Sequence, residues 1–101
     1  MGSFRAMQQR RLADENGFQL RVVAFPVRAQ VEAAFVEDDP QRRLSELTGA
    51  LGVPFLDLLP ALREAHASSR PLFYDHCHQT PEGSRVVARS IYDFLLNPDG
   101  E

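Results

Sequence analysis

Two short apolar segments bounded by turn-forming residues most constrain how this chain can fold. Residues 20–25 (LRVVAF) lie between Gly17 and Pro26, and residues 53–58 (VPFLDL) follow Gly52. Both are short and contain the β-branched and aromatic side chains that favour strands. The first segment lacks a clean polar–apolar alternation, which is typical of a buried parallel strand. We therefore predict two strands, over residues 20–25 and 53–58.

Helical patterns fill the segments around these strands. In one of them Leu44, Leu47 and Leu51 form a predicted buried stripe, with Pro40 in the first turn and Gly52 as the stop. Helices that alternate with strands imply a parallel sheet with right-handed crossovers. The predicted class is thus α/β, with a short parallel sheet flanked by helices. The predicted helices cover residues 3–16, 30–35, 40–51, 61–66 and 84–96.

The composition excludes several classes of function. The chain has 101 residues, enough for one domain, of which 44% are hydrophobic and 25% charged. Its net charge is −3, so we expect no nucleic-acid surface, and no apolar run approaches the length of a membrane span. The single cysteine, Cys77, excludes an internal disulfide and a zinc site made of several cysteines.

Titratable side chains gather in the segment from Leu72 to Gly83. Within it, Asp75 precedes His78 by three residues on a predicted loop. A carboxylate at this spacing can turn back and accept a hydrogen bond from Nδ1 of the imidazole. That bond fixes the tautomer and leaves Nε2 to take a proton from a hydroxyl nucleophile. Thr80 is a suitable N-cap and Pro81 a suitable first residue for the helix that follows.

Residues 73–83 (FYDHCHQTPEG), followed by VVA at 86–88 and Phe94-Leu95, resemble the last conserved block of the SGNH/GDSL hydrolases. The resemblance implies that His78 is the general base of a Ser-His-Asp triad and that Asp75 orients it. It also implies a partial flavodoxin-like α/β/α sandwich, in which residues 1–101 form one domain corresponding to the C-terminal part of the family's fold. The implied substrate is a small ester, and no cofactor is needed.

Two parts of that family's site are absent from the sequence. Its nucleophile stands in a Gly-Asp-Ser triplet, and a Gly-x-Asn-Asp segment helps to complete its oxyanion hole; neither occurs here. These parts act as a unit with the base, so we expect the chain alone to be inactive. The resemblance then implies a C-terminal fragment that supplies the Asp-His half of an esterase or acyl-transfer triad.

Other interpretations of the same loop stay open. Asp75 and His78 can form a purely structural hydrogen bond. Cys77 can be a half-buried filler, or a nucleophile activated by a neighbouring histidine, although adjacent side chains on an extended loop point apart. Asp75, His76, Cys77 and His78 are also zinc-binding types. Because the remaining histidine, His66, lies on a separate predicted helix, we expect adventitious rather than physiological metal binding.

Two parallel strands leave sheet edges and apolar faces uncovered. We therefore expect a homodimer, a swapped oligomer or a loosened fold. This expectation also defines an alternative function, a non-catalytic interaction module that dimerises through its uncovered sheet. Asp57, on the second predicted strand, is expected to be structural.

Overall fold

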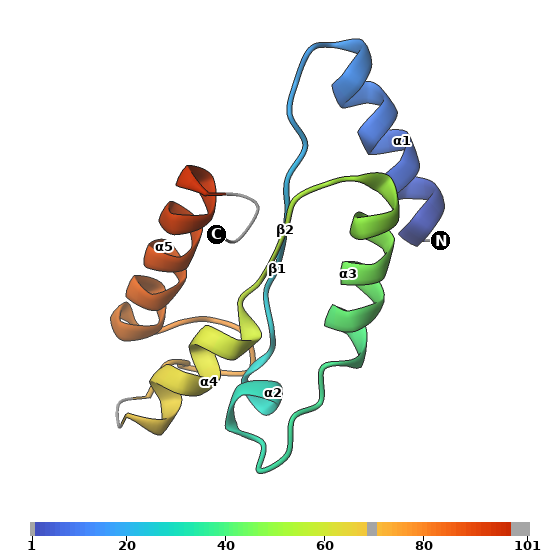
Figure 1. Ribbon diagram of the computed structural model, residues 1–101. Helices are drawn as coiled ribbons and strands as arrows, with labels where there is room; N and C mark the ends of the chain where they lie inside the picture. Colours follow the sequence, from blue (N-terminus) through green and yellow to red (C-terminus); the bar gives the residue numbers. More distant parts are fainter. Residues whose placement is uncertain (1, 69–70, 98–101) are drawn as a thin grey trace.

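The chain folds into five helices and a two-stranded sheet over the residues that the computed structural model describes, 2–68 and 71–97 (Figure 1). The helices alternate with the strands as the sequence predicts. In chain order the elements are α1 (Gly2–Glu15), β1 (Val22–Ala24), α2 (Arg28–Glu32), α3 (Asp39–Leu51), β2 (Phe55–Asp57), α4 (Leu59–Ala67) and α5 (Pro81–Leu96).

The two strands are parallel and lie between two layers of helices. Val22 pairs with Phe55, Val23 with Leu56 and Ala24 with Asp57. Figure 1 shows α4 and α5 on one side of the sheet and α1 and α3 on the other. This arrangement is a partial flavodoxin-like α/β fold, and it confirms the predicted class. No described helix is long and apolar enough to cross a membrane.

The strands are shorter than predicted because prolines limit the ladder. Pro54 accepts a hydrogen bond from the N–H of Val22 (3.0 Å) but has no N–H of its own to extend the pairing. Beyond the other end of β1, Pro26 also lacks a donor. Each strand therefore keeps three residues of the six in its predicted segment.

Helix α2 begins and ends earlier than the predicted 30–35. The side-chain oxygen of Gln30 accepts the N–H of Val27 (3.2 Å), which satisfies a donor at the start of the helix. Ala33 is already extended, with ψ 144°. Nη1 of Arg63, on α4, donates to the carbonyls of Gln30 and Ala33, both at 2.9 Å. A cation at the C-terminal end of a helix is also favourable to its dipole.

The predicted buried stripe of α3 is only half-buried. The fully buried positions of this helix are polar, Gln41 and Thr48. Both have partners: the amides of Gln41 and Gln30 exchange two hydrogen bonds of 3.0 and 3.1 Å, and the hydroxyl of Thr48 donates to the carbonyl of Leu44 (2.9 Å). These bonds remove the cost of burying polar groups. The three leucines of the stripe, Leu44, Leu47 and Leu51, are each half-buried.

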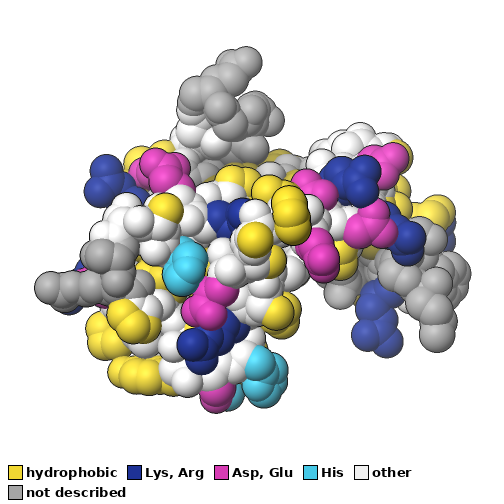
Figure 2. All heavy atoms as spheres, turned by 90° about the horizontal axis from the view of Figure 1, so that it is seen from below, with side chains coloured by type: hydrophobic (Ala, Val, Ile, Leu, Met, Phe, Trp, Pro, Cys, Tyr) yellow, Lys and Arg dark blue, Asp and Glu magenta, His cyan; other side chains and the backbone are white. Residues whose placement is uncertain are grey.

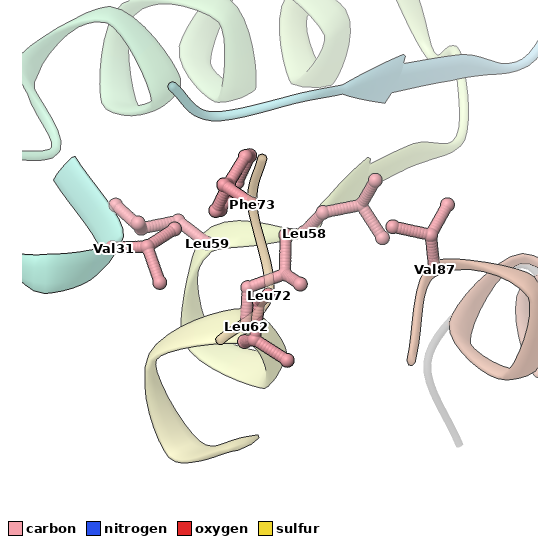
Figure 3. Close-up of a cluster of buried hydrophobic side chains, with 7 residues drawn as sticks. All are labelled: Val31, Leu58, Leu59, Leu62, Leu72, Phe73 and Val87. Carbon is pink, nitrogen blue, oxygen red and sulfur yellow. The ribbon is translucent and has the colours of Figure 1, made fainter. Parts of the chain in front are cut away.

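The main hydrophobic core lies on the α4–α5 side of the sheet (Figure 3). Its centre is the start of α4, where Leu58, Leu59 and Leu62 are almost completely buried. Leu72 and Phe73 enter the same cluster from the segment between α4 and α5. The loop that carries Asp75 and His78 is thereby attached directly to the core. The cluster comprises Val31, Leu58, Leu59, Leu62, Leu72, Phe73 and Val87.

Candidate functional site

Residues 72–80 form a closed loop whose two ends are hydrogen-bonded to each other. Phe73 and Gln79 form an antiparallel bridge, and the N–H of Thr80 donates to the carbonyl of Leu72 (3.0 Å). Further along the loop, the N–H of Tyr74 donates to the carbonyl of His78 (2.8 Å). The three residues between them, Asp75, His76 and Cys77, therefore lie in a short, defined turn.

Thr80 joins this loop to α5. Its hydroxyl group donates to the carbonyl of Pro71 (2.7 Å), and its hydroxyl oxygen accepts the N–H of Gly83 (3.2 Å). With Pro81 as the first helical residue, the predicted N-cap of α5 is confirmed. One threonine thus fixes both the start of the helix and the return of the loop.

The carboxylate of Asp75 organises the turn. Its Oδ1 accepts the backbone N–H of Cys77 (3.0 Å) and that of His78 (2.9 Å). These two bonds, together with the imidazole of His78, hold the pKa of Asp75 well below its ordinary value, with the N–H of Cys77 as the largest cause. Asp75 is consequently ionised at neutral pH and acts only as an acceptor.

His78 turns back onto Asp75, as the spacing predicts. Its Nδ1 lies 2.8 Å from Oδ2 and 3.0 Å from Oδ1 of that carboxylate. Since an ionised carboxylate accepts only, Nδ1 must carry the proton, and the neutral ring then has its lone pair on Nε2. None of the described residues forms a hydrogen bond with Nε2. The His78 side chain is 74% exposed and that of Asp75 49% exposed.

The loop lies beside the C-terminal end of β1. The N–H of Arg28, the first residue of α2, donates to the carbonyl of His76 (2.8 Å). In open α/β sheets, ligands bind at the edge where the carboxyl ends of parallel strands meet. Viewed from this end of the molecule, histidine side chains lie at the surface near acidic and basic ones (Figure 2).

Asp57 also lies at this edge, at the end of β2, but it does not belong to the Asp75–His78 pair. Its Oδ1 accepts the N–H of Leu59 (3.0 Å) and so supports the start of α4. Burial raises the pKa of Asp57 against the lowering effect of that hydrogen bond, and the charge of Asp38 raises it further. Within the described ranges, no hydrogen bond or ion pair joins Asp57 to Asp75 or His78.

Two expectations about Cys77 are wrong. The cysteine is exposed rather than half-buried, and its Sγ lies 3.7 Å from Nδ1 of His78. Neighbouring side chains meet here because the bonds to Asp75 curl the backbone, whereas the prediction assumed an extended loop. His76 is exposed, and the half-buried His66 lies on α4.

Gly83 has a role that the sequence motif did not explain. A Cβ atom at this position would lie 2.2 Å from the carbonyl oxygen of Leu72 and 3.0 Å from Cβ of Gln79. The first turn of α5 can therefore approach the loop only without a side chain at residue 83. The sequence signal for this close approach is a glycine in the first turn of a helix, because glycine is otherwise unfavourable in helices.

A surface cavity of about 290 Å³ lies at the opposite end of the strands. Arg10, Arg21, Gly52 and Pro54 contribute to its wall, and no residue of the 72–80 loop does. The Asp75–His78 pair and this cavity therefore lie at different places on the surface.

The chain thus combines a partial flavodoxin-like fold with a hydrogen-bonded Asp-His pair at the C-terminal edge of its sheet. Residues 4–99 match the family model of the SGNH hydrolase-like domain of the acetyltransferase AlgX, and the chain belongs to this family. The match spans nearly the whole sequence, so it includes both strands and the entire site loop. No curated protein and no solved structure matches the chain significantly.

We predict that Gly83→Ala destabilises the chain by about 1–3 kcal/mol, because the new methyl group meets backbone that cannot move freely. Urea unfolding followed by circular dichroism measures the change. Gly49→Ala is the matched control, since Gly49 is also helical but a Cβ there meets nothing within 4 Å. That variant should be stabilised by about 0.5–1 kcal/mol. Equal effects of the two substitutions would show that the close approach at residue 83 is unimportant.

Acid should remove the stability that Asp75 contributes. The pKa of this carboxyl is lower in the folded chain than its ordinary value of 3.8, so its contribution is present above that value. It is lost as the pH falls from there through the folded pKa. Unfolding free energies of the wild type and Asp75→Asn, measured from about pH 5 to about pH 2, should converge as the pH falls. A difference that persists unchanged at the acid end would contradict the assignment.

Proposed function

We propose that this chain supplies the acid–base half of a Ser-His-Asp triad for acyl-ester chemistry. Asp75 orients the imidazole of His78, and Nε2 of His78 takes the proton of a serine hydroxyl from a segment outside this sequence. The observation that carries the proposal is the contact of Nδ1 with both oxygens of Asp75, at 2.8 and 3.0 Å. Membership of the SGNH hydrolase-like family supports the same assignment.

The proposed reaction proceeds in two steps. The serine oxygen attacks the acyl carbonyl while Nε2 takes its proton, and the resulting imidazolium returns that proton to the departing alcohol. The oxygen of the incoming water or hydroxyl acceptor then attacks the acyl carbon while Nε2 takes its proton. The bond from the acyl carbon to the serine oxygen breaks, and the imidazolium returns the proton to that oxygen. Asp75 stays ionised throughout and stabilises the imidazolium, a role that its lowered pKa favours.

The family's description as an acetyltransferase supports an acetyl ester as the substrate class. An acetylated carbohydrate or lipid would satisfy this chemistry, with hydrolysis and transfer differing only in whether water or a substrate hydroxyl attacks the acyl-serine. The exposed ring of His78 leaves the side that bears Nε2 open to a second segment. The pair alone lacks a nucleophile and oxyanion donors, so we propose that the isolated chain is inactive.

Hydrolysis of an activated acetyl ester tests whether the chain supplies only the acid–base half of the triad. We predict that the wild-type chain hydrolyses the ester no faster than an equal concentration of free imidazole, and that His78→Ala removes at most this small rate. Cys77→Ala is the control for a thiol nucleophile, given the 3.7 Å between Sγ and Nδ1 of His78. A rate far above the imidazole background that disappears in His78→Ala would show that the chain contains its own nucleophile.

The orientation of His78 needs its own readout, because a low rate is also expected of a purely structural pair. Nitrogen-15 chemical shifts of the imidazole identify which ring nitrogen carries the proton. We expect Nδ1–H in the wild type and a shift toward the other tautomer in Asp75→Asn. An unchanged tautomer in that variant would contradict the proposed role of Asp75, whatever the ester assay gives.

A second candidate function is an interaction module that pairs with another copy of itself. Phe18 and Phe25 flank β1 and are 71% and 55% exposed. A hollow of about 710 Å³ runs along the same strand, with Leu12, Leu20 and Val22 in its wall. Among the described residues, β1 pairs with β2 alone, which leaves its other edge for a partner. Burial of these aromatic side chains favours a homodimer over an exposed monomer.

We predict that sedimentation velocity finds a concentration-dependent dimer, and that Phe18→Ser and Phe25→Ser shift it toward monomer. Phe35→Ser is the matched control, since Phe35 is 82% exposed but lies between α2 and α3, away from β1. A monomer at every concentration would contradict the interaction module and leave the catalytic proposal unaffected.

A further inference from the structure

Three different metal-ligating side chains converge at the tip of the site loop. One ligand atom each from Asp75, His76 and Cys77 lie within 4.8 Å of one another, and all three side chains are exposed. The sequence indicated these residue types but gave no reason to expect their side chains to meet. The turn around Asp75 brings them together, since its carboxylate accepts the N–H of Cys77.

We propose that Asp75, His76 and Cys77 bind one thiophilic divalent cation of the Zn²⁺ class. A carboxylate oxygen, an imidazole nitrogen and a thiolate are all ligands of Zn²⁺, and three protein ligands with water in the fourth position are a known arrangement. A thiolate and an imidazole do not suit Mg²⁺ or Ca²⁺, which take oxygen ligands. On binding, the thiol gives up its proton to solvent and the sulfur–metal bond replaces it.

The backbone of this loop is arranged before any cation binds. The carbonyl of His76 accepts the N–H of Arg28 (2.8 Å), and the carbonyl of His78 accepts that of Tyr74 (2.8 Å). Leu72 and Phe73 hold one end of the loop in the hydrophobic core. A cation therefore orders three exposed side chains on a fixed turn rather than a flexible segment, which reduces the entropic cost of binding.

Asp75 belongs to both arrangements. Its two oxygens lie 2.8 and 3.0 Å from Nδ1 of His78, so a cation that takes an oxygen of Asp75 competes with the histidine for the same charge. The bound cation would thus weaken the orientation of His78 and inhibit any triad built on it. Only this consequence rests on the proposed function; binding of the cation does not.

Two titrations test the site: one with Co²⁺, and one with Zn²⁺ in competition with a chromogenic chelator. Both use the chain without a histidine tag, with a phosphine reductant present to keep Cys77 reduced. We expect one Co²⁺ per chain and the near-ultraviolet absorption of a thiolate–Co²⁺ bond. Removing a residue that only supports a metal ligand lowers metal affinity by about 10–100-fold. Removing a direct ligand should cost at least as much, so His76→Ala and Cys77→Ser should each weaken binding by at least about tenfold. Cys77→Ser should also abolish the absorption band.

Two further variants define the ligand set. His66→Ala should bind as the wild type does, because His66 lies on α4. His78→Ala should bind at least as tightly, since it frees Asp75 from its competitor. Binding that is absent, exceeds one ion per chain, or survives both His76→Ala and Cys77→Ser would overturn the site. A loss in His78→Ala as large as that in His76→Ala would overturn the assigned ligands and the competition. The ester assay is not involved, so failure here leaves the proposed function intact.

Discussion

The backbone of Leu72 joins the hydrophobic core to the site loop, and the position of the candidate chemistry depends on it. The Leu72 side chain is buried in the cluster centred on α4, while its carbonyl accepts the N–H of Thr80. The same carbonyl occupies the space that a side chain at Gly83 would need. A movement of the core at this point therefore displaces the loop and the start of α5 together. The exposed Asp75–His78 pair owes its placement to buried contacts a few residues away.

Local hydrogen bonds then give the loop its chemistry. One carboxylate accepts two backbone N–H groups and the imidazole, so its charge is used to shape the turn and to select the tautomer of His78. A structural and a catalytic account of the pair share this geometry. The two accounts differ in whether Nε2 of His78 accepts a proton from a nucleophile. The tautomer of His78 and the reaction rate must therefore be measured separately.

The sequence predicted the parts of this fold that depend on near neighbours. The Asp75–His78 contact spans three residues, and the start of α5 depends on Thr80 and Pro81, so both are encoded locally. The failed prediction of the buried stripe of α3 involves a partner distant in sequence. Gln41 is buried because Gln30, eleven residues earlier, pairs with its amide. The hydrogen bond between the N–H of Arg28 and the carbonyl of His76 likewise joins segments that are far apart in the sequence.

The prediction for Cys77 failed for a different reason, since all the groups involved are local. The alternation of side chains holds for an extended strand, and a carboxylate that collects successive N–H groups removes the extension. The feature that makes Asp75 a good partner for His78 therefore also brings Cys77 and His76 within reach of the same carboxylate. The turn in which one acidic side chain contacts an imidazole thereby also brings ligand atoms of Asp75, His76 and Cys77 within 4.8 Å of one another. Which of the two arrangements holds Asp75 then depends on whether a thiophilic cation is available to compete with a single imidazole.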